Sequence, residues 1–100
     1  MKLYLFRTSV FSLDPKLTME EFEVVEKPKT YMDEKRRRRF NKEDVERVSG
    51  YGMNECLLLE NNPSKAAEIL LKQKDFELEE LNKKVSKKKL EIENLKKYIK

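Results

Sequence analysis

The most concentrated charge in the chain is a run of four arginines after Lys35, namely Arg36, Arg37, Arg38 and Arg39. Guanidinium groups are planar donors that match phosphate and carboxylate oxygens, so the run could contact nucleic acid or an acidic protein surface. A second interpretation is an exposed edge strand, in which cationic side chains oppose aggregation between sheets. Neighbouring acids could neutralise part of this charge. The residues alone leave both interpretations open.

A second basic stretch lies near the end of the chain, where residues 82–100 hold eight lysines and two acidic residues. Such a stretch attracts polyanions without sequence specificity and with strong salt dependence. On a helix these lysines would point in several directions, which is also how an ordinary solvated surface looks. Together with the arginine run, the candidate contacts with nucleic acid or a partner protein are Lys83, Lys84 and Lys87.

The chain lacks the usual groups for catalysis and metal binding. It has no His and a single Cys, Cys56, so it cannot form a Cys–His nucleophile, an internal disulfide or a Cys-based zinc site. The segment Ser49–Gly52 holds both glycines but lacks the lysine of a phosphate-binding loop. Cys56 lies in an apolar run and is expected to be a small buried side chain. We therefore expect a protein that is not an enzyme and uses no metal or cofactor.

Size and composition favour one small folded unit. The chain has 100 residues and a mass of 12.1 kDa, with 42% charged residues, 38% hydrophobic residues and a mean hydropathy of −0.85. A chain of this length has room for one thin core. No apolar run approaches the ~20 residues of a membrane-spanning helix, and the hydrophobic start Met1–Arg7 is too short for a signal peptide. These features predict a cytoplasmic protein that does not contact a membrane.

Strand and turn signals fill residues 1–62, which we expect to form an α+β domain. Residues rich in aromatic and β-branched side chains predict strands over 3–11 and 22–31, with a turn at 12–16 between them. Pro28 would then lie at a bulge or an unpaired edge. The connections are short, so the pairing should be antiparallel, in a small sheet of three to four strands.

The rest of this domain contains a third extended piece, a short helix and a buried strand. The extended piece covers residues 35–40. Asn41 as an N-cap, acidic residues in the first turn and Gly50 after the last turn predict a short helix over 42–49. The apolar run 53–60 fits a strand that is buried on both faces.

Residues 63–100 predict one long helix, because Asn62 and Pro63 form a strong start signal and no breaker follows. Apolar residues recur from Leu71 with the heptad spacing of a coiled coil, interrupted at Lys74 and Lys88. A helix surrounded by solvent needs no such stripe. We expect a helix–helix contact, most simply a homodimer through this helix, in preference to the alternative in which the helix folds back on its own domain. The predicted dimer interface contains Leu71, Leu78, Leu81, Val85, Ile92, Leu95 and Ile99.

The charges that flank this interface bear on whether two such helices would pair in the parallel or the antiparallel orientation. In a parallel pair Lys84 would face the partner's Lys89, whereas in an antiparallel pair crossing near Leu81 it would face the partner's Glu77. Antiparallel pairing satisfies more charges, but each exposed pair contributes only a few tenths of a kcal/mol, so the orientation stays open. A separate stripe near the helix start is expected to dock on the sheet, and it consists of Ile69, Leu70 and Phe76.

The Lys-, Glu- and Asn-rich composition and the segment Glu26–Tyr31, followed by a basic strand and the Ser49–Gly52 turn, resemble a class of mobile-element proteins. These are small accessory proteins of phages and integrated elements in low-GC Gram-positive bacteria. The resemblance implies work in the host cytoplasm, where such proteins often bind and disable a defence machine, anti-CRISPR proteins among them.

Three functions follow as hypotheses. The first is a non-enzymatic inhibitor that binds a host nuclease complex, whose guide RNA the arginine run could also contact. The second is a nucleic-acid-binding accessory or regulatory protein. The third is a structural assembly protein in which the coiled coil is the whole function.

Overall fold

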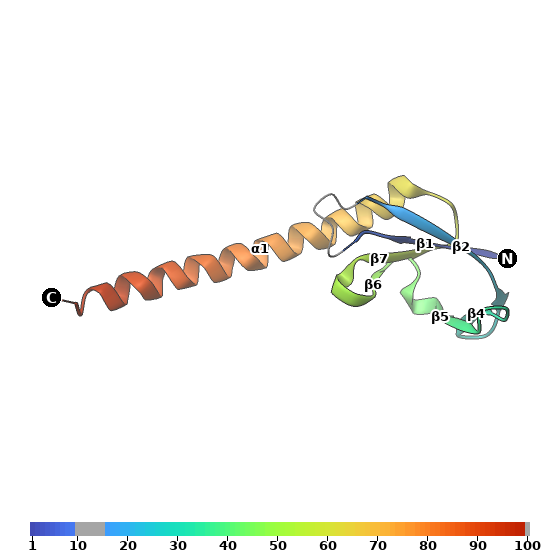
Figure 1. Ribbon diagram of the computed structural model, residues 1–100, viewed down its shortest axis with the longest axis horizontal. Coiled ribbons are helices and arrows are strands. Elements are labelled where there is room, and N and C mark those ends of the chain that lie inside the picture. Colours follow the sequence, from blue (N-terminus) through green and yellow to red (C-terminus); the bar gives the residue numbers. More distant parts are fainter. Residues whose placement is uncertain (10–15, 100) are drawn as a thin grey trace.

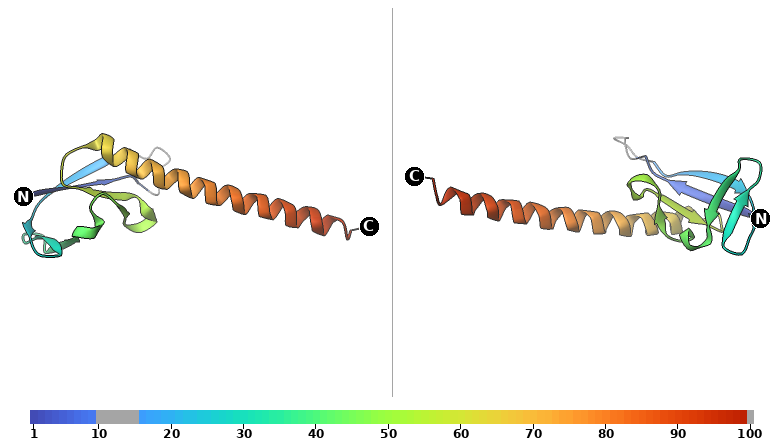
Figure 2. Two further views of the ribbon diagram at one scale, coloured as in Figure 1. Left: turned by 180° about the vertical axis from the view of Figure 1, so that it is seen from behind. Right: turned by 90° about the horizontal axis from the view of Figure 1, so that it is seen from below.

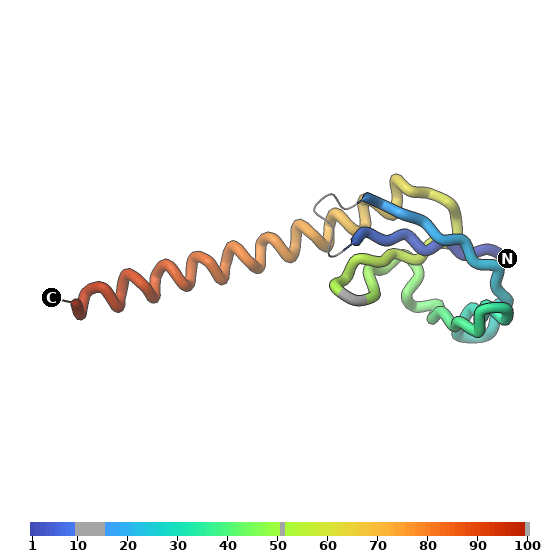
Figure 3. The backbone as a smooth tube through the Cα atoms, in the orientation of Figure 1, coloured from blue at the N-terminus to red at the C-terminus, as the bar shows by residue number. Residues whose placement is uncertain are grey.

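One long helix projects from a small β-domain in the structure, a computed structural model that describes residues 1–9 and 16–99 (Figure 1). The molecule measures 69 × 28 × 20 Å, and its N-terminus and C-terminus lie at opposite ends of the long axis (Figure 3). The elements, in chain order, are β1 (Lys2–Arg7), β2 (Thr18–Glu23), β3 (Val25–Glu26), β4 (Thr30–Asp33), β5 (Arg38–Asn41), η1 (Lys42–Asp44), β6 (Val48–Ser49), η2 (Tyr51–Met53), β7 (Glu55–Leu58) and α1 (Pro63–Lys96).

The strands form two antiparallel sheets. The larger sheet has the order β2-β1-β7-β6, and the smaller has the order β3-β4-β5. β1 pairs along its whole length with β2, from Lys2 opposite Glu23 to Arg7 opposite Thr18, and it pairs with β7 on its other side. The α+β class is confirmed, but the single sheet of three to four strands was too simple an expectation.

Side-chain alternation along β1 and β7 divides the interior into two clusters on opposite faces of the larger sheet. The first cluster fills the space between the two sheets and contains Leu3, Leu5, Phe22, Val24, Tyr31, Phe40 and Leu57. The second packs that sheet against the helix and contains Phe6, Cys56, Leu58, Ala66 and Leu70. The larger sheet is therefore covered on both faces, and the prediction of a doubly buried strand within 53–60 is confirmed.

Two predicted strands have different limits in the structure. β1 ends at Arg7, and the N–H of Thr8 donates to the carbonyl of Asn54. Positions 10 and 11 of the predicted first strand, and the predicted turn at 12–15, lie outside the described residues. The predicted strand over 35–40 begins only at Arg38, because residues 34–37 form a turn.

The predicted second strand over 22–31 is wrong as one element. It divides into β2, β3 and β4, and the break at Val24 occurs where this residue turns into the core and its N–H donates to the carbonyl of Met1. Pro28 lies in the turn between β3 and β4, which the N–H of Lys27 closes by donating to the carbonyl of Thr30. A fixed φ suits proline to this turn, so neither a bulge nor an unpaired edge is needed.

The predicted short helix over 42–49 is wrong. Only one 3-10 turn forms, Asn41 makes no side-chain cap, and the chain then extends into β6. Val45 packs in the cluster between the sheets, whereas Val48 packs in the cluster under the helix. Eight residues make a marginal helix, and placing these two β-branched side chains in separate cores requires an extended chain. Gly50 has a φ of +78°, as expected, but it precedes the β6–β7 turn.

The start of α1 agrees with its prediction, but the helix ends at Lys96, so positions 97–99 of the predicted helix over 63–100 do not belong to it and position 100 lies outside the described residues. Asn62 is the N-cap, and its Oδ1 accepts a hydrogen bond of 3.1 Å from the N–H of Lys65. Pro63 occupies the first turn, where its missing N–H costs nothing. The Lys65 ammonium also forms an ion pair with Glu46, which raises the pKa of Lys65 and ties the helix to the loop before β6.

Only the first turns of α1 pack against the sheet, as two further views show (Figure 2). Leu70 is buried and Ile69 packs at the edge of the cluster, as predicted, but Phe76 is 57% exposed and does not dock. The helix passes the end of the sheet before it reaches Phe76, and every residue from 81 to 99 is exposed. No helix in the described part of the chain is long and apolar enough to cross a membrane.

We predict that Leu70→Ala lowers the free energy of unfolding by about 2–4 kcal/mol, because it leaves a cavity between α1 and the sheet. Phe76→Ala is the matched control in the same helix and should change stability by about 0.5 kcal/mol or less, since its side chain is mostly exposed. Urea unfolding followed by circular dichroism measures both. Equal losses for the two variants would contradict the docking described above.

Candidate functional site: an exposed helix face and an arginine turn

The first candidate surface is the apolar face of α1 beyond the sheet. We call it the helix seam and define it by Leu78, Leu81, Val85, Ile92 and Leu95, whose side chains are 50–67% exposed. Ile99, also predicted at this interface, is 76% exposed but follows the last residue of α1, Lys96. The remaining residue of the predicted interface, Leu71, is 60% exposed and lies closer to the domain. All seven predicted positions are thus on the surface of one copy of the chain. A row of large apolar side chains on a solvated helix is typical of a binding surface.

The first d position of the heptads, Lys74, is partly covered by the domain. Its ammonium donates to the Oδ1 of Asn54, just before β7, and it also lies 3.5 Å from Glu77. The part of the heptad pattern that is open to a second helix therefore begins after Lys74.

The predicted lysine site lies on the same projecting helix. Lys83 forms an ion pair with Glu80 at 3.4 Å, and Lys88 forms one with Glu91 at 3.3 Å. Lys84, Lys87 and the neighbouring Lys89 make no ion pair with any residue that the structure describes. These three ammonium groups are the ones that could meet an anion without first breaking an internal contact.

The second candidate surface is the arginine run, which the structure places in the turn between β4 and β5 and at the start of β5. Asp33, at the end of β4, shapes this turn: its Oδ1 accepts 3.1 Å hydrogen bonds from the N–H groups of Lys35 and Arg36. Arg37 then adopts a φ of +52°, which reverses the chain. The sequence indicated Asp33 only as one of the acids near the run, and its position directly before the turn at residues 34–37 was the signal for this role.

Two of the four arginines are engaged within the domain. Arg36 forms an ion pair with Glu20 of β2, and its guanidinium lies 5.0 Å from the centre of the Phe22 ring. Arg38 stacks over the same ring at 5.3 Å and over Phe40 at 4.8 Å. Cations over aromatic faces are attracted by the ring quadrupole, so these arginines cover the open side of the core. Sequence reasoning missed Glu20 and both phenylalanines as partners of the run.

The other two arginines point elsewhere. Arg37 occupies the turn, and Arg39 is exposed on the face of the smaller sheet opposite Phe40 and Arg38, as strand alternation requires. Neither makes an ion pair with a described residue. The run is thus divided: Arg36 and Arg38 belong to the domain, and Arg37 and Arg39 are the side chains available to a partner.

The two basic surfaces do not come together. The β4–β5 turn lies at one end of the 69 Å molecule and the lysines lie along the helix that leads to the other end (Figure 1). A short ligand could not reach both, so they need a long polyanion, a large complex or two separate partners.

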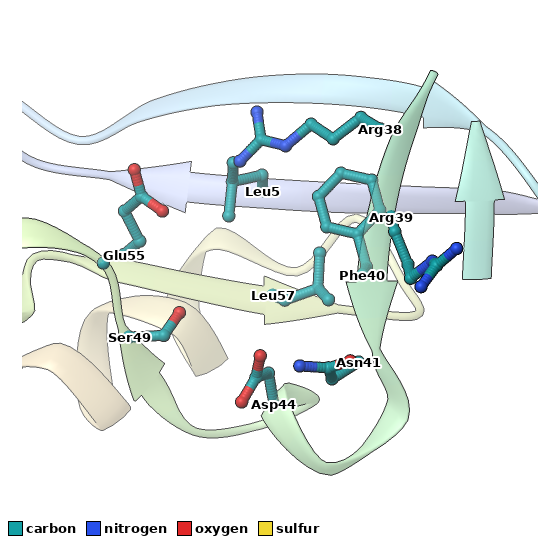
Figure 4. A pocket seen from close by; sticks show the side chains of 10 residues that line it. Leu5, Arg38, Arg39, Phe40, Asn41, Asp44, Ser49, Glu55 and Leu57 are labelled. Atoms are coloured by element: carbon teal, nitrogen blue, oxygen red, sulfur yellow. The ribbon is translucent and has the colours of Figure 1, made fainter. Parts of the chain in front are cut away.

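A small cavity lies between β5 and the larger sheet (Figure 4). Its volume is about 210 Å³, with Leu5, Phe40 and Leu57 at its base and Arg38 across the top. Ligand sites usually measure ~300–1,000 Å³, so this cavity is small for an organic substrate. Its polar rim includes Asp44, Ser49 and Glu55.

Groups suited to chemistry are few among residues 1–9 and 16–99. No three acidic or Cys side chains there lie close enough to hold a metal ion. Cys56 is fully buried in the cluster under α1, and burial raises the pKa of its thiol. A buried thiol with a raised pKa is a poor nucleophile. This agrees with the expectation that Cys56 is a packing residue.

Comparison of the chain with models of protein families, with curated proteins and with solved structures found no match. The function is therefore inferred from the two surfaces described above.

We predict that Arg38→Ala lowers the free energy of unfolding by about 0.5–1 kcal/mol, because it removes the guanidinium from two aromatic rings. Arg39→Ala, one residue away on the opposite face, is the control and should leave stability unchanged within about 0.3 kcal/mol. Urea unfolding at low salt measures both. A larger effect for Arg39→Ala would show that the division of the run is wrong.

Proposed function

We propose that the protein acts by binding and not by catalysis, as a phage-type inhibitor that occupies a host nuclease complex carrying guide RNA, in the manner of an anti-CRISPR protein. The observation that carries the binding role is the helix seam, whose apolar side chains are at least half exposed along about five turns of α1. Exposing that much apolar surface is unfavourable unless a partner covers it.

Pairing of two copies through the helix seam, as a coiled coil, is part of the proposal. A dimer would carry two arginine turns on one particle. Each turn lies at the end of its domain away from the projecting helix, so pairing of the helices would leave both turns exposed. Two weak contacts on one particle bind a large target much more tightly than one. This arrangement suits a complex with an extended surface better than it suits a small ligand.

The charge of the exposed surfaces supports an RNA-bearing target. Arg37 and Arg39 at the turn and Lys84, Lys87 and Lys89 on the helix have no internal ion pair among the described residues. Contacts of such groups with phosphates gain free energy from the release of counterions. A guide-RNA complex offers both phosphates and protein surface. The phosphates could contact the cationic side chains of this protein, and the protein surface could contact its apolar side chains.

The absence of activated groups in the described residues supports binding over catalysis. The thiol of Cys56 is inaccessible, and the cavity between the sheets is small and carries both signs of charge. An inhibitor that blocks by occupying a surface needs neither a nucleophile nor a deep cleft.

The test is a cleavage assay with purified RNA-guided nuclease complexes from low-GC Gram-positive bacteria and labelled target DNA. We expect the wild-type protein to inhibit at least one complex near stoichiometry, and Arg37→Glu/Arg39→Glu to inhibit it at least about tenfold less well. Lys27→Glu/Lys29→Glu is the matched control, since it makes the same charge change on the exposed β3–β4 turn of the same sheet. Its inhibition should remain within about twofold of wild type.

Two results would contradict the proposal. If no complex is inhibited but bare RNA is bound, with affinity that falls steeply with salt and with the arginine substitutions, the protein is instead a nucleic-acid-binding accessory factor. If neither binding nor inhibition depends on Arg37 and Arg39, the arginine turn has no anionic target, and its cations serve only to protect an edge strand.

A further inference from the structure

We infer that α1 pairs with α1 of a second copy in the antiparallel orientation, with Leu78 against the partner's Leu95 and Leu81 against the partner's Ile92. This inference rests on the dimer in the proposed function and specifies its orientation and register. It depends on three observations: where the domain covers the helix, where lysine interrupts the seam, and which charges flank it.

The domain determines how far a second helix can extend along α1. Ala66 and Leu70 face the sheet, and Lys74 is hydrogen-bonded to Asn54, so the helix is covered on this side up to Lys74. An antiparallel crossing near Leu81 would lay the last turns of the second helix along residues 63–70, where the sheet already lies. The exposed part of α1 runs from about residue 75 to Lys96, and its midpoint is near residue 86. A crossing there leaves both domains clear of the paired helices.

Lys88, which occupies a d position within the seam, favours the antiparallel pair. In a parallel pair in register, Lys88 would face the same residue of the partner within one layer of the seam, which places two ammonium groups together. With the antiparallel crossing near residue 86, Lys88 instead lies beside the partner's Val85. There its methylene stem can cover apolar surface while the ammonium stays in water, near Glu91 of its own helix at 3.3 Å.

The flanking charges favour the same arrangement. In this antiparallel register residues at g flank each other and residues at e flank each other, so Lys84 meets the partner's Glu91 and Asp75 meets the partner's Lys96. Both contacts are attractive. In the parallel pair Lys84 would meet the partner's Lys89, which is repulsive, and only Glu91 would find an opposite charge. The length of helix that the domain leaves exposed, the interrupting lysine and the flanking charges thus agree on one register.

A charge reversal distinguishes the two orientations by the sign of its effect. We expect Lys84→Glu to raise the dimer Kd about three- to tenfold at low salt, because it then faces the partner's Glu91. In a parallel dimer the same change would face the partner's Lys89 and lower the Kd. Lys87→Glu makes the same charge change away from the seam and should alter the Kd less than about twofold. Adding Glu91→Lys to Lys84→Glu should restore the wild-type Kd, as measured by sedimentation equilibrium.

Cross-linking tests the register directly. Leu81→Cys mixed with Ile92→Cys should give a disulfide-linked heterodimer on oxidation, whereas either variant alone should not cross-link. A parallel dimer would cross-link each variant alone. The wild-type chain is the control for Cys56, which is fully buried. Small-angle scattering should also show a particle clearly longer than the 69 Å of one copy, since the domains lie at opposite ends.

These results separate the inference from the proposals on which it rests. Cross-linking of each variant alone, or a lower Kd for Lys84→Glu, overturns the antiparallel register and leaves the dimer intact. A monomer at all concentrations, or an assembly of more than two copies, overturns both the register and the dimer. A monomer would therefore also remove the dimer from the proposed function, whereas the inhibitory role itself is tested separately by the nuclease assay.

Discussion

The organisation of this molecule depends on a mismatch in length between its helix and its domain. α1 has 34 residues and is about 51 Å long, whereas the sheet reaches only its first turns. Everything after that point must be solvated or covered by another molecule. The exposed seam therefore follows from geometry: a domain of about 60 residues has too little surface to bury both its own sheets and a helix of this length.

The larger sheet supports the projecting helix and is covered on both faces. β1 and β7 each contribute side chains to the core between the sheets and to the core under α1, so the helix start and the smaller sheet are anchored to the same strands. Asn62 and Pro63 set where the helix begins, and Ala66 and Leu70 fix its direction. As a consequence, α1 extends away from the β4–β5 turn, and the arginines and the helix lysines face separate regions of solvent.

Strand alternation explains why a run of four identical residues does not act as one site. Neighbouring residues of a strand point to opposite faces, so Arg38 lies over Phe22 and Phe40 while Arg39 lies on the outer face. The Asp33 turn adds a further reversal at Arg37. Arg36 and Arg38 thereby cover an aromatic core, and only Arg37 and Arg39 make no ion pair with a described residue.

The sequence by itself determined the features that depend on local chemistry and on periodicity. These are the start of α1 at Asn62 and Pro63, the heptad spacing of apolar residues along the helix and the doubly buried strand around Cys56. Only the tertiary structure decided the features that depend on residues distant in the chain: the division of 22–31 into three strands, the loss of the helix over 42–49, the exposure of Phe76 and the engagement of Arg36 with Glu20. Local propensity is similar for the alternatives in 22–31 and 42–49, and no local signal determines which distant residues Phe76 and Arg36 meet. Long-range burial and side-chain contacts select between the alternatives in each case.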